Sequence, residues 1–357
     1  MPIPASLHDA VRKSFDDVVI SGRHLSTAIE NLFREIHPAP GLATTLRAIL
    51  FQAIRYNNVE AAIHGSLDGV CDPDLADIPT FLRELVVAEY GADANRVLAT
   101  LLVDAPTFIR VNTLRTTVVA CYDELLPYNP LWISGDILRI DRPFGLFASE
   151  VFEMGWFEQQ DITSQRAGHE LDAKPGQRII DACAGAGGKT LLFAASMQNK
   201  GRIIALDTNA GKLQALRHRI ARAGADIIDP RVITSTKVVK RLADTADGVF
   251  IDEPCTGTGV LRRNPDILRS LTEKTYKELL AIQADILRRN ARLAKPGGTV
   301  VYATCSVLPS EGRDHITAFL ASEEGAPFTL ANTWQTLPGE NGGDGFYVAR
   351  LTRSSAS

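Results

Sequence analysis

The chain has 357 residues, 45% of them hydrophobic and 22% charged, which is the composition of an ordinary globular protein of two or three domains. No apolar run approaches the ~20 residues that span a bilayer, and the first residues lack the apolar segment of a secretion signal, so we expect a cytoplasmic protein without a membrane partner. The net charge of −4 argues against a generally basic nucleic-acid binder; residues 1–150 hold 12 basic and 19 acidic side chains (−7), and the remainder holds 26 and 23 (+3).

The first hundred residues show apolar side chains at three- and four-residue intervals, for example in residues 25–36 and 42–63. This spacing predicts amphipathic helices packed on one another, interrupted by the Pro/Asp-rich stretch 71–80. We therefore expect a helical N-terminal domain over residues 1–104. Short β-branched runs at 106–117 and 135–143 predict two strands, within a small α+β linking subdomain over residues 105–158.

From about residue 160, strand-like apolar runs alternate with helical stretches. Such alternation is typical of an α/β fold, a doubly wound and mostly parallel sheet with helices on both faces. We place a catalytic domain over residues 159–353. The expected strands and the turns after them lie at residues 177–185, 202–209, 231–236, 248–255 and 297–306.

The first of these strands runs into the glycine-rich segment DACAGAGGKT, residues 181–190. Its glycines let the backbone bend tightly and approach a ligand at a helix N-terminus. The segment resembles the phosphate loop of nucleoside triphosphatases, and GVFIDEP (248–254) resembles their magnesium-binding strand, so a P-loop ATPase is an alternative. The phosphate loop needs glycine where this chain has Cys183, which argues against the ATPase.

Asp207 ends the second expected strand, where an acid in nucleotide-binding α/β folds binds ribose hydroxyls. It could instead cap the helix that follows. A glycine loop followed by such an acid fits both NAD and S-adenosylmethionine.

The five cysteines are widely spaced and form no CxxC pair, so we expect no metal site and no disulfide framework. Cys71 and Cys121 are interpreted as ordinary core residues. Cys255 and Cys305 follow the fourth and fifth strands, which should be neighbours roughly 5 Å apart in a doubly wound sheet. Two thiols at adjacent strand ends, with Asp252 nearby, indicate chemistry rather than packing.

A thiol pair beside a methyl donor suits methylation at C5 of cytosine, because a thiolate that adds to C6 makes C5 nucleophilic. An acid near N3 favours that addition, and Asp252 is the candidate. A second thiol could assist release of the product. Lys189 is a candidate for the cationic setting that keeps Cys305 ionised.

Six motifs in order resemble the Sun/RsmB family of RNA (cytosine-5) methyltransferases: QDITSQ, DACAGAGGKT, ALDTNAGKL, DEPCTGTGVLRRNPD, KPGGTVVYATCSVLPSEG and DGFYVARL. The resemblance implies a Rossmann-like domain that binds S-adenosyl-L-methionine and methylates RNA, with 16S ribosomal RNA favoured and transfer RNA as an alternative. It implies that Cys305 forms the covalent adduct and Cys255 aids product release. It also implies cofactor contacts from the loop and four further positions: Cys183, Ala184, Gly185, Ala186, Gly187, Gly188, Lys189, Asp207, Lys212, Thr236 and Asp252.

Two positions depart from the family pattern. Ala186 stands where the family usually has proline, and Thr236 stands where an aspartate usually contacts the adenine side of the cofactor, with Ser235 or Asp229 as possible substitutes. The N-terminal helices resemble a shortened NusB-like domain, whose acidic charge fits RNA binding poorly. A catalytically weak RNA-binding relative that acts in ribosome assembly is therefore a further alternative.

Arginines near the expected site are candidate contacts for RNA phosphates, because the target base must leave its stack to reach the thiols. They are Arg110 and Arg115 on the linking subdomain, and Arg262, Arg263 and Arg269 after the DEPC motif. We expect single-stranded or loop RNA as substrate, and a monomer by default.

Overall fold

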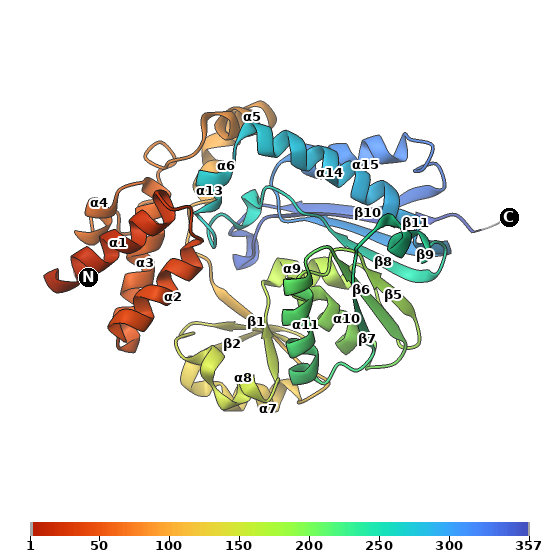
Figure 1. The fold of residues 1–357 in the computed structure, drawn as a ribbon, viewed down its shortest axis with the longest axis horizontal. Coiled ribbons are helices and arrows are strands. Elements are labelled where there is room, and N and C mark those ends of the chain that lie inside the picture. The colour runs from red at the N-terminus through yellow and green to blue at the C-terminus, as the bar shows by residue number, and fades with distance from the viewer. Residues whose placement is uncertain (1–2, 356–357) are drawn as a thin grey trace. The chain divides into compact units, whose positions relative to one another are not determined.

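The structure, a computed structural model, describes residues 3–355 (Figure 1). The chain divides into two compact units. One comprises the chain up to Ala105 together with Thr256–Lys277, and the other comprises Pro106–Cys255 together with the chain from Glu278 onward. No helix in the described part is both long and apolar enough to cross a membrane.

The first unit is helical, as the periodicity predicts. In α2 the buried residues Leu25, Ala28, Ile29 and Leu32 recur at three- and four-residue intervals and form one apolar face. Its helices are α1 (His8–Val19), α2 (Leu25–Ile36), α3 (Pro40–Tyr56), α4 (Val59–Ile63), α5 (Thr80–Tyr90), α6 (Ala94–Thr100) and α13 (Ile267–Ser270).

The segment that follows the DEPC motif is anchored within this helical unit. Arg55 of α3 donates to the carbonyl of Arg262 at 2.9 Å and pairs with Asp104 at 2.9 Å. Arg269 of α13 pairs with Asp77 at 3.2 Å. These bonds hold residues 256–277 against helices that precede them by about two hundred positions in the chain.

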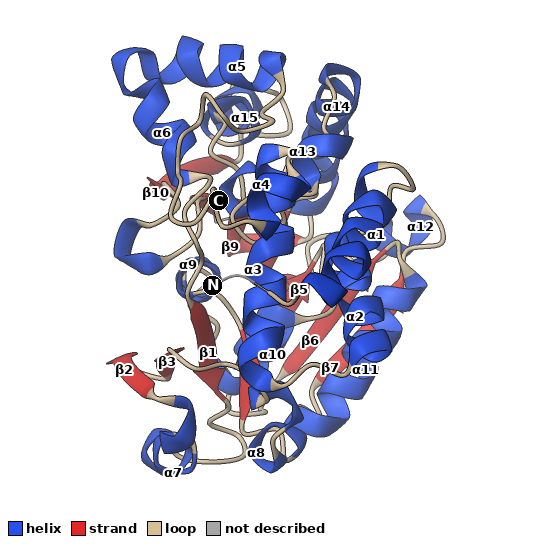
Figure 2. Ribbon diagram, turned by 90° about the vertical axis from the view of Figure 1, so that its left-hand side faces the viewer, coloured by secondary structure: helices blue, strands red, loops and turns tan. Residues whose placement is uncertain are grey.

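The second unit contains two sheets. The smaller is antiparallel, in the order β2-β3-β1-β4. Figure 2 labels three of its strands, β2, β3 and β1. Its core gathers Ile109, Leu138, Phe157 and the buried Cys121. Its elements are β1 (Thr107–Val111), α7 (Val118–Glu124), β2 (Pro130–Ser134), β3 (Ile137–Ile140), α8 (Glu150–Glu153) and β4 (Phe157–Gln159).

The larger sheet has the strand order β10-β11-β9-β8-β5-β6-β7. Neighbours from β9 to β7 pair in parallel, and β11 and β10 are antiparallel. The strand order reverses between β5 and β8, the switch point where α/β sheets bind ligands. Its strands are β5 (Arg178–Asp181), β6 (Arg202–Asp207), β7 (Ile228–Val232), β8 (Ala246–Asp252), β9 (Ala294–Thr304), β10 (Phe328–Thr336) and β11 (Phe346–Arg353).

Helices cover both faces of this sheet (Figure 1), because alternate strand residues point to opposite sides. Ile180 and Val249 face one core, with α12, α14 and α15, whereas Ile179 and Phe250 face the other, with α9, α10 and α11. The predicted doubly wound α/β fold is thereby confirmed. The helices are α9 (Ile162–His169), α10 (Gly188–Ser196), α11 (Ala210–Ala223), α12 (Thr236–Lys240), α14 (Glu273–Ala291) and α15 (Arg313–Leu320).

Candidate active site

The glycine loop joins β5 to α10 and has the tight geometry that the sequence predicts. Gly185 and Gly187 have φ angles of +54° and +89°, a region that favours glycine. A Cβ on Gly187 would lie 2.1 Å from the Leu216 side chain, so a larger residue would have to displace that side chain. Helix α10 begins immediately afterwards, at Gly188. The loop therefore brings backbone amides close to whatever binds at the switch point.

Asp207 at the end of β6 holds this loop from the neighbouring strand. Its Oδ2 accepts from the Gly185 backbone N–H at 2.8 Å, and its Oδ1 accepts from the N–H of Asn209 at 2.7 Å. Asn209, not Asp207, caps α11, because its side chain accepts from the Lys212 N–H at 3.1 Å. The helix-cap interpretation of Asp207 is therefore wrong, and its position at the loop fits a cofactor contact.

The two thiols meet at the carboxyl edge of the sheet. Strand β8 pairs in parallel with β9, with Asp252 opposite Ala303, and the sulfurs of Cys255 and Cys305 lie 3.4 Å apart. A disulfide bond measures about 2.05 Å, so these are two thiols in contact. The two cysteines, 50 positions apart in the chain, are brought together as the topology predicts.

Lys189 and Asp252 form an ion pair beside the thiols. The Lys189 ammonium lies 2.8 Å from the Asp252 carboxylate and packs over the rings of Phe250 and Phe346. Burial alone would lower the pKa of Lys189, but the charge and hydrogen bond of Asp252, and the negative charge available on Cys305, raise it. Lys189 is therefore a permanent cation that acts on both the acid and the predicted nucleophile.

Burial raises the pKa of three other titratable groups near the edge, Asp181, Cys183 and Glu253. Burial raises the pKa of Asp181 to about 7, opposed by the hydrogen bond from Thr190 at 2.6 Å. Burial, assisted by Glu253, raises the pKa of Cys183 well above its ordinary value, so this loop thiol stays protonated. Glu253 is itself buried, and neither of its carboxyl oxygens has a hydrogen-bond partner among the described residues. Its pKa is raised well above the usual value, first by burial and then by Asp252.

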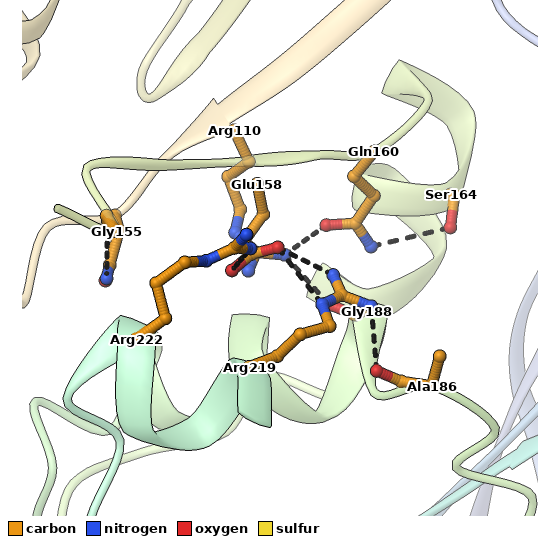
Figure 3. A network of polar contacts seen from close by, with 10 residues as sticks. Arg110, Gly155, Glu158, Gln160, Ser164, Ala186, Gly188, Arg219 and Arg222 are labelled. Carbon is orange, nitrogen blue, oxygen red and sulfur yellow. Dashed lines mark hydrogen bonds and ion pairs between the residues drawn. The ribbon is translucent and has the colours of Figure 1, made fainter. Parts of the chain in front are cut away.

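A second polar network braces the glycine loop from outside (Figure 3). Arg219 of α11 donates to the carbonyl of Ala186 at 2.7 Å and pairs with Glu158 of β4 at 2.8 Å. Arg222 pairs with the other oxygen of the same carboxylate at 2.7 Å. Glu158 is only 2% exposed, so its carboxylate is shielded from water while the two arginines reach the surface. The sequence analysis did not predict a role for Arg219, Arg222 or Glu158.

Arg110 belongs to this network and does not face RNA, so its predicted role is wrong. Its guanidinium is buried and donates to the Gly188 carbonyl at 3.0 Å and to Gln160. Arg262 is also buried, 1% exposed, which removes it as a phosphate contact. Both assignments failed because residue type does not reveal burial. The opposite error occurred at Cys71, which was predicted to be a core residue but is exposed in the Pro/Asp-rich loop.

The remaining arginine assignments stay predictions. Arg115 is exposed and donates to the carbonyl of Ala221 at 3.2 Å, and Arg263 is half-buried. Arg269 is held by Asn57 and Asp77, which competes with a phosphate contact.

The positions expected to face the rest of the cofactor lie at the ends of β6 and β7. Lys212 is exposed on the first turn of α11, and Thr236 is the exposed first residue of α12. Ser235 precedes it at the N-cap position. Asp229 is held by Arg231 at 2.7 Å and by Arg202 at 2.8 Å, so it does not replace the missing aspartate.

Comparisons with known proteins match this domain. Residues 169–352, just over half of the chain, fit the family described as 16S rRNA methyltransferase RsmB/F. Two curated relatives carry the description ribosomal RNA small subunit methyltransferase B. The protein of Pasteurella multocida is 35% identical, over 60% of this chain and 51% of its own length. The protein of Yersinia pseudotuberculosis is 32% identical, over 77% of this chain and 66% of its own. The chain thus spans about half to two thirds of these relatives.

Among solved structures, the crystal structure of PH0851 matches with a TM-score of 0.83 and 23% identity, covering 98% of this chain and 99% of that one. At this identity the likeness speaks for the fold alone. The family match, by contrast, includes the glycine loop, Asp207 and both thiols in a single domain. The chain belongs to the RsmB/F family of 16S rRNA methyltransferases.

Proposed function

We propose that the protein transfers the methyl group of S-adenosylmethionine to C5 of a cytosine in RNA, with 16S ribosomal RNA as the substrate. The observation that carries this proposal is the contact between the sulfurs of Cys255 and Cys305, 3.4 Å apart beside the Lys189–Asp252 pair. Family membership supports the methyltransferase class and the ribosomal substrate.

The loop residues suit S-adenosylmethionine, which carries a ribose and no phosphate. The Asp207 carboxylate lies at the strand end where ribose hydroxyls bind, and it accepts from the Gly185 backbone N–H of the glycine loop. Lys212 and Thr236 would face the cofactor further along the same edge. When bound, the sulfonium supplies an electrophilic methyl group.

The chain's own residues account for the remaining steps. The thiolate of Cys305 forms a bond to C6, and the electron pair of the C5–C6 double bond becomes available at C5 for the methyl group. The acid form of Asp252 donates a hydrogen bond to N3 and so favours the addition. After transfer, a base takes the C5 proton and the bond between Cys305 and C6 breaks, which restores the double bond. Cys255, in contact with Cys305, assists this release.

The test is incubation of wild type and Cys255→Ala with tritiated S-adenosylmethionine and unmodified ribosomal RNA, followed by a denaturing gel and nucleoside analysis. We expect label in 5-methylcytidine with wild type, and an RNA-linked protein band with Cys255→Ala. Cys71→Ala, which removes an exposed thiol, is the matched control and should behave as wild type. Label only with transfer RNA would reassign the substrate. No label with either RNA would favour the RNA-binding relative without catalysis.

A further inference from the structure

A buried side chain of α14 contacts the loop that carries the first thiol. Gln283 is fully buried, and its Nε2 donates to the carbonyl of Pro254 at 2.9 Å. Pro254 directly precedes Cys255 in the chain. The same Nε2 donates its other hydrogen to Oε1 of Glu311, also at 2.9 Å. Both amide hydrogens of Gln283 are therefore used.

Glu311 continues this connection to the second thiol loop. Its Oε2 accepts from the hydroxyl of Ser306 at 2.5 Å, and Ser306 directly follows Cys305. Its backbone carbonyl accepts from the hydroxyl of Tyr302 at 2.7 Å, on the strand that leads to Cys305. Glu311 and Ser306 are both fully buried. A continuous chain of hydrogen bonds thus runs from Pro254 to Ser306, and we call these four residues, Pro254, Gln283, Glu311 and Ser306, the thiol tie.

The orientation of the Gln283 amide is fixed by a further contact. Nε2 of His315 lies 3.0 Å from Oε1 of Gln283. An amide oxygen only accepts hydrogen bonds, so His315 donates here, and the amide nitrogen must face Pro254 and Glu311. Burial lowers the pKa of His315 and favours the neutral ring, which makes this bond as the tautomer with its hydrogen on Nε2. The amide is held at both ends and cannot rotate without losing bonds.

We propose that Gln283 and Glu311 are positioning residues that set the separation of the two thiols. Each holds the backbone or hydroxyl next to one of the cysteines. The β8–β9 ladder extends to the bond from the Glu253 N–H to the Ala303 carbonyl, 2.9 Å long and two residues before each cysteine, so the ladder alone does not fix the two loops. The catalytic meaning of this spacing rests on the proposed function, in which both thiols serve one nucleotide.

The spacing can be measured without RNA or methyl donor, as the effective concentration of the two thiols. In a glutathione redox buffer, Cys255 and Cys305 pass two electrons and two protons to glutathione disulfide. A disulfide bond forms between the cysteines, and glutathione disulfide is cleaved to two glutathione thiols. The equilibrium constant, read by mass spectrometry of the linked peptides in a Cys71→Ser background, gives that concentration. It depends on how the thiols are held relative to each other.

We expect Gln283→Met and Glu311→Leu to lower the effective concentration roughly tenfold or more, because each breaks the tie. Glu311→Gln should stay close to wild type, since its amide retains a bond to each partner. Asn290→Leu is the matched control. Asn290 is a buried amide on the same helix, and its Nδ2 donates to the carbonyl of Ile286 at 2.9 Å, within that helix. It should leave the effective concentration unchanged.

Two outcomes would overturn the proposal: wild-type values for both Gln283→Met and Glu311→Leu, or an equal fall in Asn290→Leu, which would indicate general loosening. If the two tie variants fail to fold, Ser306→Ala decides, because it removes one hydroxyl and should still lower the value. In the methylation assay the folded tie variants should accumulate the RNA-linked band seen with Cys255→Ala. A normal redox result with no methylation by wild type would count against the proposed function and leave the tie intact.

Discussion

The ammonium of Lys189 lies 2.8 Å from the carboxylate of Asp252, and the lysine side chain is 8% exposed whereas the aspartate is 34% exposed. The cation is thus buried and fixed, while the acid keeps a side open to a ligand. A buried ion pair contributes little net stability, but removing one partner leaves the other uncompensated. The main effect of the pair is therefore to place a fixed positive charge beside Asp252 and Cys305.

Lys189→Met should reduce methylation by about 10²- to 10³-fold, because the fixed positive charge that orients Asp252 beside the thiols is lost. The measurement is the single-turnover rate with ribosomal RNA, together with the melting temperature. Lys200→Met, which removes an exposed lysine outside the site, should leave the rate unchanged. An unchanged rate in Lys189→Met would remove the lysine from the mechanism.

Cys305→Ala should abolish both methyl transfer and the RNA-linked band, because the nucleophile itself is missing. The double variant Cys255→Ala/Cys305→Ala should also form no band, which separates the two roles. Incorporation of label from tritiated S-adenosylmethionine measures methyl transfer, and a denaturing gel of the same sample measures the RNA-linked band. Methylation retained by Cys305→Ala would show that the thiol roles are reversed or that the chemistry is different.

Arg219→Met should weaken the binding of S-adenosylmethionine roughly tenfold, because the carbonyl of Ala186 loses its donor and Glu158 loses one of two cations. Equilibrium dialysis measures the dissociation constant directly. Arg217→Met, a neighbouring exposed position on α11, is the control. If both variants bind the cofactor like wild type, the brace does not shape the loop.

Asp181→Asn should flatten the pH dependence of stability. The folded pKa of Asp181, about 7, lies above the value of 3.8 for an unperturbed aspartate, so the folded state binds the proton more tightly than the unfolded chain does. The free energy of unfolding should therefore fall as the pH rises from about 4 to about 7, by an amount on the order of 2–4 kcal/mol. Urea unfolding at several pH values measures it. Parallel pH curves for wild type and variant would refute the assignment.

The parts of the site that could be predicted from sequence are those in which a local motif follows a strand whose place in the sheet is known. Cys255 and Cys305 follow strands whose order is set by the doubly wound pattern, so their proximity was predictable. The roles of Arg110 and Arg262 were not, because burial is decided by packing between distant segments. Gln283 was overlooked for a similar reason: it lies within an ordinary helical pattern, and only the fold brings it against Pro254 and Glu311.

Glu158 sits on the last strand of the small sheet, yet both of its cations belong to a helix of the large one. A chain shortened to begin at residue 160 would keep every family motif and still leave Arg219 and Arg222 without their counter-charge. Such a fragment would contain the chemistry but lose the support of its cofactor loop. The two sheets therefore share one charge network, and a fragment that keeps the cofactor loop braced has to begin upstream of Glu158.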